Sequence, residues 1–211
     1  MNTNEQNPIP AQQEASPTPP VKADLSRTTL EYVEMFVFTV ITVILLLTFV
    51  FRICVVSGPS MNNSLYDGER LLVSNLFYTP ETGDVIVFHQ TSEINDVFNE
   101  PIVKRVIATE GEHVKIDYTA GKVYVSADAV FTEDEVLDES EYVYLDSGYW
   151  REYGRQSDTY EVPENHLFVM GDNRNVSADS RSIYVGMVDQ RRILGKVLLR
   201  ISPISKLGKV D

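Results

Sequence analysis

The chain contains one long apolar run near its amino-terminus. The seventeen residues from Met35 to Phe51 carry no charge, and Arg52 ends the run. A helix of that length is about 26 Å long, and the apolar residues at 53–56 extend the run toward a hydrocarbon core of about 30 Å if Arg52 reaches the interface. A cleaved signal peptide, which has a shorter apolar region and a small-x-small site, and a buried core helix are the alternatives. We predict a retained transmembrane anchor over residues 31–56.

Beyond the anchor, the pattern changes to short segments rich in β-branched and aromatic residues. Seven of them have the composition and length of strands: Leu71–Ser74, Asp84–His89, Ile102–Ala108, Val114–Asp117, Lys122–Ser126, Leu167–Gly171 and Ile193–Ile201. The small and polar residues of Tyr118–Gly121 fit a hairpin turn between two of these segments. No long segment with a 3.6-residue period follows the anchor. The sequence therefore predicts a mainly β domain over residues 57–211.

The segment that precedes the anchor, residues 1–30, has a different composition. Half of the ten prolines lie within the first twenty positions, among Gln, Asn, Thr and Ser. Such a segment buries too little apolar surface to offset the entropy lost on ordering. We predict a disordered tail. The flanking charges, Lys22 and Arg27 before the run against Arg52 and Arg70 after it, leave the orientation of the anchor open.

The charge balance excludes one class of partner. The formal net charge is −13, and the clusters of Lys and Arg that bind phosphates are missing, so nucleic acid is not a predicted partner. Much of the acidity lies at 128–161, which has eleven Asp or Glu against Arg151 and Arg155. We predict that this Tyr-rich acidic segment is a solvated insertion. Its role is open between a contact surface and the cover of a small core of its own.

Metal and thiol chemistry have no basis in the sequence. The single cysteine, Cys54, lies at the edge of the anchor, so the β domain has neither a disulfide nor a thiolate ligand. Three histidines, His89, His113 and His166, are far apart and form no metal-ligand spacing. We predict no metal and no cofactor.

Ser60 is the candidate nucleophile. It lies eight residues after Arg52 in the sequence SGPSM, where Gly58 and Pro59 set a turn and leave backbone close to the hydroxyl. An extended chain covers at most about 3.6 Å per residue, so Ser60 stays near the membrane. Its substrate is therefore predicted to be membrane-tethered. Taken alone, Gly-Pro-Ser is common in loops.

A serine nucleophile needs a base, and Lys104 in the apolar-flanked segment PIVKRVIA is the candidate. Neighbouring residues on a strand face opposite sides, so one of Lys104 and Arg105 is predicted to point inward. Burial disfavours the ammonium and so lowers the pKa of a lysine. The alternative is a strand whose lysine extends into solvent.

The third candidate feature is a polar loop after a predicted strand, VMGDNRNVSADSR at 169–181. Ser177 offers a hydroxyl to whatever lies beneath the loop. Four charged residues could tie the loop together by ion pairs: Asp172, Arg174, Asp179 and Arg181. A well-hydrogen-bonded turn without further function is the alternative.

Together these segments resemble the type I signal peptidase (leader peptidase) family, the membrane-bound serine proteases that remove signal peptides from exported proteins. The resemblance covers about Val55 to Gly195, through SGPSM, LYDGERLLV, GDVIVF, KRVIATEGE and GDNRNVSADSR in order. A single amino-terminal anchor is similar to the Gram-positive members. The resemblance implies a signal-peptidase-like β catalytic domain on the extracytoplasmic side of the plasma membrane, with residues 1–30 in the cytoplasm. The implied partners are signal-peptide-bearing preproteins and membrane lipid.

The resemblance also implies a Ser–Lys dyad that works by acyl transfer. Ser60 would be the nucleophile and Lys104 the general base, with Ser177 hydrogen-bonded to the lysine amine. Asp179 and Arg181 would support the loop.

The other matched positions concern the oxyanion and the loop. The backbone N–H of Ser60 would be one oxyanion donor. Many relatives add a serine hydroxyl at the position of Gly58, which a glycine cannot supply. Relatives also usually have proline at the position of Asn63. Asp172 and Arg174 would be structural residues of the polar loop.

Two other functions are compatible with parts of the sequence. A Ser-His-Asp hydrolase would use one of the three histidines, but no Gly-x-Ser-x-Gly element is present. A catalytically silent or specialised relative could act as an envelope scaffold through residues 128–161. The presence of both Ser60 and Lys104 argues against a silent protein.

Overall fold

A computed structural model of the chain describes residues 25–90, 101–143 and 157–210. Its contacts divide the chain into two compact units, Met1–Thr42 and Val43–Asp211. Most of the predicted disordered tail, residues 1–24, lies outside the described residues, as do 144–156 of the acidic segment. Residues 25–30, also assigned to the tail, instead begin a helix.

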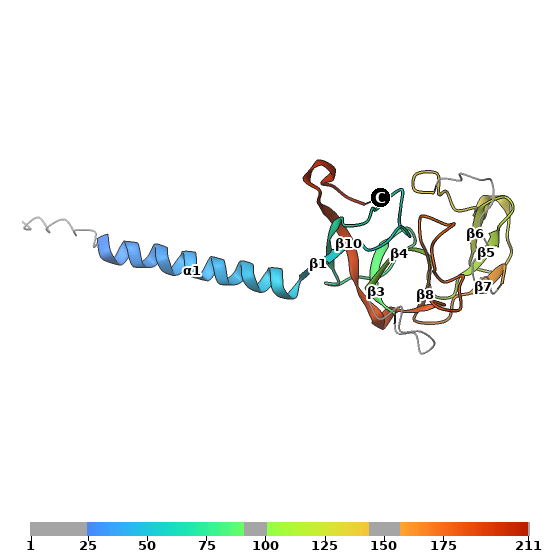
Figure 1. The fold of residues 1–211 in the computed structure, drawn as a ribbon. Coiled ribbons are helices and arrows are strands. Elements are labelled where there is room, and N and C mark those ends of the chain that lie inside the picture. Colours follow the sequence, from blue (N-terminus) through green and yellow to red (C-terminus); the bar gives the residue numbers. More distant parts are fainter. Residues whose placement is uncertain (1–24, 91–100, 144–156, 211) are drawn as a thin grey trace, which may run out of the picture. The chain divides into compact units, whose positions relative to one another are not determined.

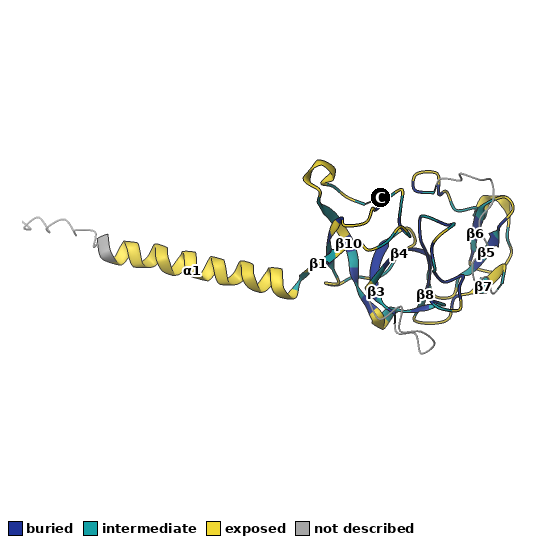
Figure 2. Ribbon diagram, in the orientation of Figure 1, coloured by how far each residue is buried: buried dark blue, intermediate teal, exposed yellow. Residues whose placement is uncertain are grey.

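The apolar run forms helix α1, Leu25–Phe49. The part Arg27–Phe49 is long and apolar enough to cross a membrane, and its side chains are exposed (Figure 2). Three threonines within it donate their hydroxyls to the carbonyl four residues earlier, so their polar groups are satisfied inside the helix. Residues 53–56 do not extend the helix, contrary to the prediction. The chain leaves it before β1, Phe51–Val55, where the backbone groups pair with β2 instead.

Seven strands form the larger sheet, in the order β1-β2-β10-β3-β4-β8-β9 (Figure 1). Their bounds are β1 Phe51–Val55, β2 Arg70–Ser74, β3 Val85–His89, β4 Pro101–Ala108, β8 His166–Met170, β9 Val188–Asp189 and β10 Ile193–Ser202. All neighbouring pairs are antiparallel. β4 lies between β3 and β8. Because Arg105 of β4 is paired with Met170 at the end of β8, the loop that follows β8 begins beside β4.

Three strands form the smaller sheet, in the order β6-β5-β7. Its strands are β5 His113–Asp117, β6 Lys122–Ser126 and β7 Thr159–Glu161. The predicted hairpin turn at 118–121 is confirmed: Asp117 Oδ1 accepts the N–H groups of Thr119 and Ala120, and Gly121 N–H donates to the Asp117 carbonyl. β7 belongs to the acidic segment 128–161 and pairs with β5, and Glu139 and Tyr142 of the same segment are buried, so the segment is not wholly a solvated insertion.

The mainly β prediction is confirmed, and so are the seven predicted strands, each to within one residue at either end. Three strands were missed: β1, which was assigned to the anchor, and the short β7 and β9. Three short 3₁₀ turns, at Glu133–Glu135, Gln190–Arg192 and Ile204–Lys206, complete the described elements.

The buried apolar side chains of the described residues form three clusters. One of them contains Met61 and Leu65, which are 1% and 0% exposed and pack with side chains of β2, β3, β4 and β10. Full burial of such a side chain contributes about 1.5–3 kcal/mol. The turn after Ser60 is therefore held against the sheet by two side chains that follow it in the sequence.

Candidate active site

Ser60 lies in a turn that connects β1 to β2. Gly58 adopts φ +83°, a left-handed conformation that favours glycine, and its N–H donates to Asp67 Oδ1 at 2.8 Å. Leu65 N–H then donates to the Met61 carbonyl at 2.8 Å, which starts the turn that the two buried side chains hold in place. Ser60 is half-buried, so its hydroxyl is both positioned and accessible.

Lys104 meets Ser60 from the middle of β4. Its Nζ lies 2.7 Å from Ser60 Oγ and donates a second hydrogen bond to the Val103 carbonyl at 2.9 Å. Lys104 is only 3% exposed. Burial lowers the pKa of Lys104 to about 8, an effect that the charges of Asp179 and Asp172 oppose and that of Arg181 supports. Two candidate residues that are 44 positions apart in the sequence are thus in direct contact.

Both residues of the Lys-Arg pair are buried, whereas the sequence predicted that one would point inward. Arg105 is 3% exposed, like Lys104. Its guanidinium forms two hydrogen bonds with the Asp172 carboxylate, both 2.9 Å long, and a third with the Gly83 carbonyl. A buried arginine on the opposite side of the strand is possible because a carboxylate and a carbonyl satisfy it.

Asp179 and Arg181 form a bidentate ion pair within the polar loop 171–181. Arg181 Nε donates to Asp179 Oδ1 at 2.8 Å and Nη2 to Oδ2 at 2.9 Å, and Gly171 N–H adds a third hydrogen bond to the carboxylate. Burial alone would raise the pKa of Asp179, but the neighbouring Arg181 and these hydrogen bonds hold it below its usual value. The buried loop therefore carries a neutralised pair beside Lys104.

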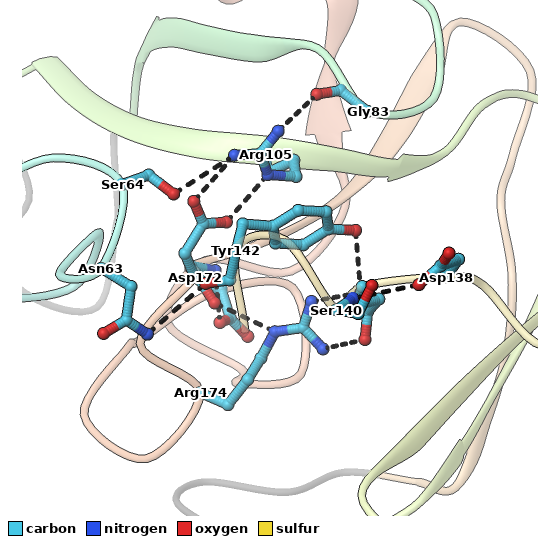
Figure 3. Close-up of polar contacts among 12 residues, drawn as sticks. Asn63, Ser64, Gly83, Arg105, Asp138, Ser140, Tyr142, Asp172 and Arg174 are labelled. Atoms are coloured by element: carbon cyan, nitrogen blue, oxygen red, sulfur yellow. Dashed lines mark hydrogen bonds and ion pairs between the residues drawn. The ribbon is translucent and has the colours of Figure 1, made fainter. Parts of the chain in front are cut away.

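The other two charged residues of the loop have partners outside it, contrary to the prediction of ion pairs within the loop (Figure 3). Asp172 pairs with Arg105 of β4. Arg174 pairs with Glu139, which belongs to the acidic segment and was not among the predicted site residues. The sequence holds no local signal for this partner, because 35 residues separate the two.

The polar loop also touches the nucleophile turn through its backbone. Asn173 N–H donates to the Ser60 carbonyl and Asn173 Nδ2 donates to the Pro59 carbonyl, both at 3.1 Å. At Gly171 the approach is closer still: a Cβ atom there would lie less than 3.0 Å from the Ser60 carbonyl oxygen and from Ser177. Sequence reasoning missed Gly171, although its place between a strand and the polar loop is a usable signal for a close backbone approach.

The remaining predicted residues do not all form the contacts expected of them around Ser60 and Lys104. Ser177 is 4% exposed and lies beside Gly171, but its predicted hydrogen bond with Lys104 is not formed, because Lys104 Nζ donates to Ser60 and Val103 instead. The Gly58 N–H is taken by Asp67. Asn63 adopts φ +96°, a value that proline, the residue expected here from the resemblance, cannot adopt.

The three histidines lie at the ends of strands. They occupy the end of β3 and the first positions of β5 and β8. In the part of the chain that the structure describes, no histidine forms a hydrogen bond with Ser60, and no group of three or more His, Cys, Asp or Glu could hold a metal ion.

Comparison with known proteins places the chain in the class of peptidases. A family model described as "Signal peptidase, peptidase S26" matches residues 29–202. Signal peptidase I of Leptolyngbya laminosa is 30% identical over 217 residues, covering 100% of this chain and 97% of that protein. Signal peptidase I of Bacillus licheniformis is 31% identical, with coverage of 86% and 92%. "Probable signal peptidase I-2" of Synechocystis sp. is 32% identical, with coverage of 86% and 77%.

The match covers most of the chain, including both β4 and the polar loop. The protein therefore belongs to the type I signal peptidase family, peptidase S26. Helix α1 fits the membrane anchor of such an enzyme.

Proposed function

We propose that this protein is a membrane-bound serine endopeptidase that removes signal peptides from exported preproteins through a Ser60–Lys104 dyad. The observation that carries the proposal is the 2.7 Å contact between Lys104 Nζ and Ser60 Oγ at a buried lysine. Family membership supports the reaction class, and the relatives named above are signal peptidases.

The chemistry begins with a proton transfer from the serine to the lysine. In its neutral form, Lys104 Nζ accepts the proton of Ser60 Oγ as the oxygen attacks the scissile carbonyl. The lysine ammonium then gives its proton to the leaving amine of the substrate. In the second step neutral Lys104 takes a proton from a water molecule as the water oxygen attacks the acyl carbon, and the ammonium returns that proton to Ser60 Oγ as the bond between the acyl carbon and Oγ breaks. A pKa of about 8 supports this role, because a considerable fraction of Lys104 is neutral near pH 8.

The developing oxyanion needs donors close to Ser60. We assign one to the backbone N–H of Ser60, which forms no backbone hydrogen bond within the described residues. Gly58 cannot supply a hydroxyl, and its N–H already donates to Asp67. Ser177 is buried next to the nucleophile turn. We assign to its hydroxyl a hydrogen bond with Lys104 in the reacting complex, where catalytic hydrogen bonds are tighter than in the free enzyme.

We further propose that α1 is the single membrane anchor and that residues 57–211 lie outside the cytoplasm. Signal-peptide-bearing preproteins are themselves held at the membrane, so an anchored site acts at a high effective concentration of substrate. β1 follows the anchor directly and Ser60 lies five residues after β1, which keeps the nucleophile near the lipid. A silent scaffold is the weaker proposal, because it gives no reason for a buried lysine against Ser60.

Sealed membrane vesicles test both the reaction and its side of the membrane. Cells that produce the full-length chain are converted to right-side-out and to inverted vesicles, and a secretory precursor is added outside. We expect right-side-out vesicles to cut the precursor at its signal-peptide junction, identified by mass spectrometry. Inverted vesicles should cut it only after detergent opens them.

Vesicles that contain Ser60→Ala provide the background from other peptidases. Cleavage by intact inverted vesicles above that background would reverse the proposed side. Failure of detergent-solubilised protein to cut the precursor would contradict the proposed reaction.

The pH dependence of cleavage should report the ionisation of Lys104. Because the neutral amine is the active form, kcat/KM should rise with pH through a midpoint at about 8. Arg181→Ala removes a positive charge that lowers the pKa of Lys104 and leaves the Asp179 carboxylate without its partner. Both changes favour the ammonium, so we expect the midpoint to move upward by about one pH unit, or about 1.4 kcal/mol.

Arg181→Lys is the matched control, because it keeps a positive charge beside Asp179. Its profile should remain closer to that of the wild type than the profile of Arg181→Ala. An unshifted profile in folded Arg181→Ala protein would limit this ion pair to support of the loop.

A further inference from the structure

Residues 138–143, here called the brace segment, connect the acidic segment to the candidate active site (Figure 3). Glu139 is 8% exposed, and its carboxylate receives both terminal nitrogens of Arg174: Nη1 donates to Oε2 at 2.7 Å and Nη2 donates to Oε1. The Arg174 side chain is also buried. A bidentate pair of this kind is both strong and specific in geometry.

Tyr142 makes the second connection of the brace segment. Its ring lies under the guanidinium of Arg105, with 3.9 Å between Cζ and the ring centroid, and its hydroxyl donates to Glu139 Oε1 at 3.2 Å. The Tyr142 carbonyl accepts a hydrogen bond of 3.4 Å from Asn63 Nδ2 in the nucleophile turn. Tyr142 is 9% exposed, so this stacking is shielded from solvent, where cation–π contacts are strongest.

These contacts reach all three parts of the site. Arg105 is the neighbour of Lys104 on β4, and Asn63 is three residues after Ser60. Arg174 donates through Nε to the Gly171 carbonyl at 3.1 Å, and its own carbonyl accepts from Arg181 Nη2 at 2.8 Å. The brace segment therefore contacts the base strand, the nucleophile turn and the polar loop at once.

We propose that the brace segment sets the relative positions of Ser60, Lys104 and the polar loop, and that Glu139 and Tyr142 are positioning residues for their reaction. This assigns a role to the acidic segment and rests on the proposed acyl transfer. The physical reason is the charge of Arg174. Without Glu139 the buried Arg174 guanidinium loses the carboxylate that accepts from both of its terminal nitrogens, and the polar loop has another carboxylate, Asp172, two positions before Arg174.

A shift of Asp172 toward Arg174 would release Arg105 from its partner beside Lys104. The loop that carries Ser177 and Asp179 would move with it. Small displacements of reacting groups lower the rate of the chemical step much more than they weaken substrate binding, since the reaction requires near-attack distances. Loss of Glu139 should therefore lower kcat rather than raise KM.

The test compares Glu139→Gln with Glu141→Gln in the full-length protein. Glu141 is an exposed acid of the same segment, so its variant controls for loss of charge alone. We expect Glu139→Gln to lower kcat on the precursor at least about 10-fold with KM within about twofold, and Glu141→Gln to equal the wild type. Glu139→Gln/Arg174→Gln, which removes both charges, should be at least about threefold faster than Glu139→Gln alone.

A second readout tests the positioning role of the brace segment without using the proposed substrate. The burst of p-nitrophenolate from p-nitrophenyl acetate measures acylation of Ser60 and also counts active sites. If the precursor is not cut but acylation shows the same order of variants, the proposed substrate is wrong and the positioning role is supported.

Two results would overturn the positioning role. One is a kcat per titrated active site that is equal in Glu139→Gln and Glu141→Gln. The other concerns Tyr142 and applies even if Glu139→Gln does not fold: Tyr142→Phe keeps the ring under Arg105, so its kcat should exceed that of Tyr142→Leu. Equal rates for these two variants would show that the ring does not position Arg105.

Discussion

Removal of either member of the proposed dyad is expected to abolish cleavage of a secretory precursor while the domain stays folded. Ser60→Ala removes the attacking oxygen. Lys104→Met keeps the length and apolar stem of the lysine and removes only the amine that lies 2.7 Å from that oxygen. We expect kcat/KM to fall at least about 1,000-fold in each variant. The two residues act as a unit, so the double variant should lose little more than either single variant.

The fold should tolerate these changes because of how the neighbouring charges are paired. Asp172 has Arg105 as its partner and Asp179 has Arg181, so loss of the lysine ammonium leaves no carboxylate without a counter-ion. Burial already disfavours that ammonium. Thermal unfolding followed by circular dichroism measures this directly, and Lys104→Met should melt no lower than about 3 °C below the wild type.

Replacement of all three histidines is the companion experiment. His89, His113 and His166 lie at strand ends, and none contacts Ser60 within the described residues. Substantial activity should remain without them. A dead histidine-free protein together with an active Lys104→Met protein would favour the Ser-His-Asp mechanism instead.

The strands were predictable because each carries its own signal. Alternating or apolar segments of four to nine residues, bounded by turn residues, were enough to find seven strands. The three missed strands lacked that signal for different reasons. β1 continues an apolar run that also fits a helix, and β7 and β9 have only three and two residues.

The candidate site was predictable only where its residues lie in motifs. Ser60, Lys104 and the Asp179–Arg181 pair were found in this way, and the structure brings the first two into contact. Glu139 could not be found, because its partner is distant in the sequence and its segment looks like an ordinary charged surface. A Glu is buried only where the fold brings a guanidinium into contact with it, and the local sequence pattern around the Glu does not encode that contact.

Gly171→Ala should inactivate the enzyme through a single added methyl group. The added Cβ would lie less than 3.0 Å from the Ser60 carbonyl oxygen and from the side chain of Ser177. A flexible side chain can turn away from such a contact, but a backbone carbonyl cannot. The Ser60 carbonyl also accepts the Asn173 N–H, so the nucleophile turn and the polar loop would separate together. We expect kcat to fall at least about 100-fold, since Ser60 moves relative to Lys104.

Gly208→Ala is the matched control, because a Cβ atom at Gly208 meets nothing within 4 Å. The activity of this variant should equal that of the wild type. The double variant Gly171→Ala/Ser177→Gly distinguishes the two contacts. It removes the side chain that the new methyl group meets but leaves the Ser60 carbonyl in place, so its p-nitrophenyl acetate acylation should stay below that of Ser177→Gly alone, which lacks the same hydroxyl. Acylation equal to that of Ser177→Gly alone would mean that the backbone approach at Gly171 does not hold Ser60 in position.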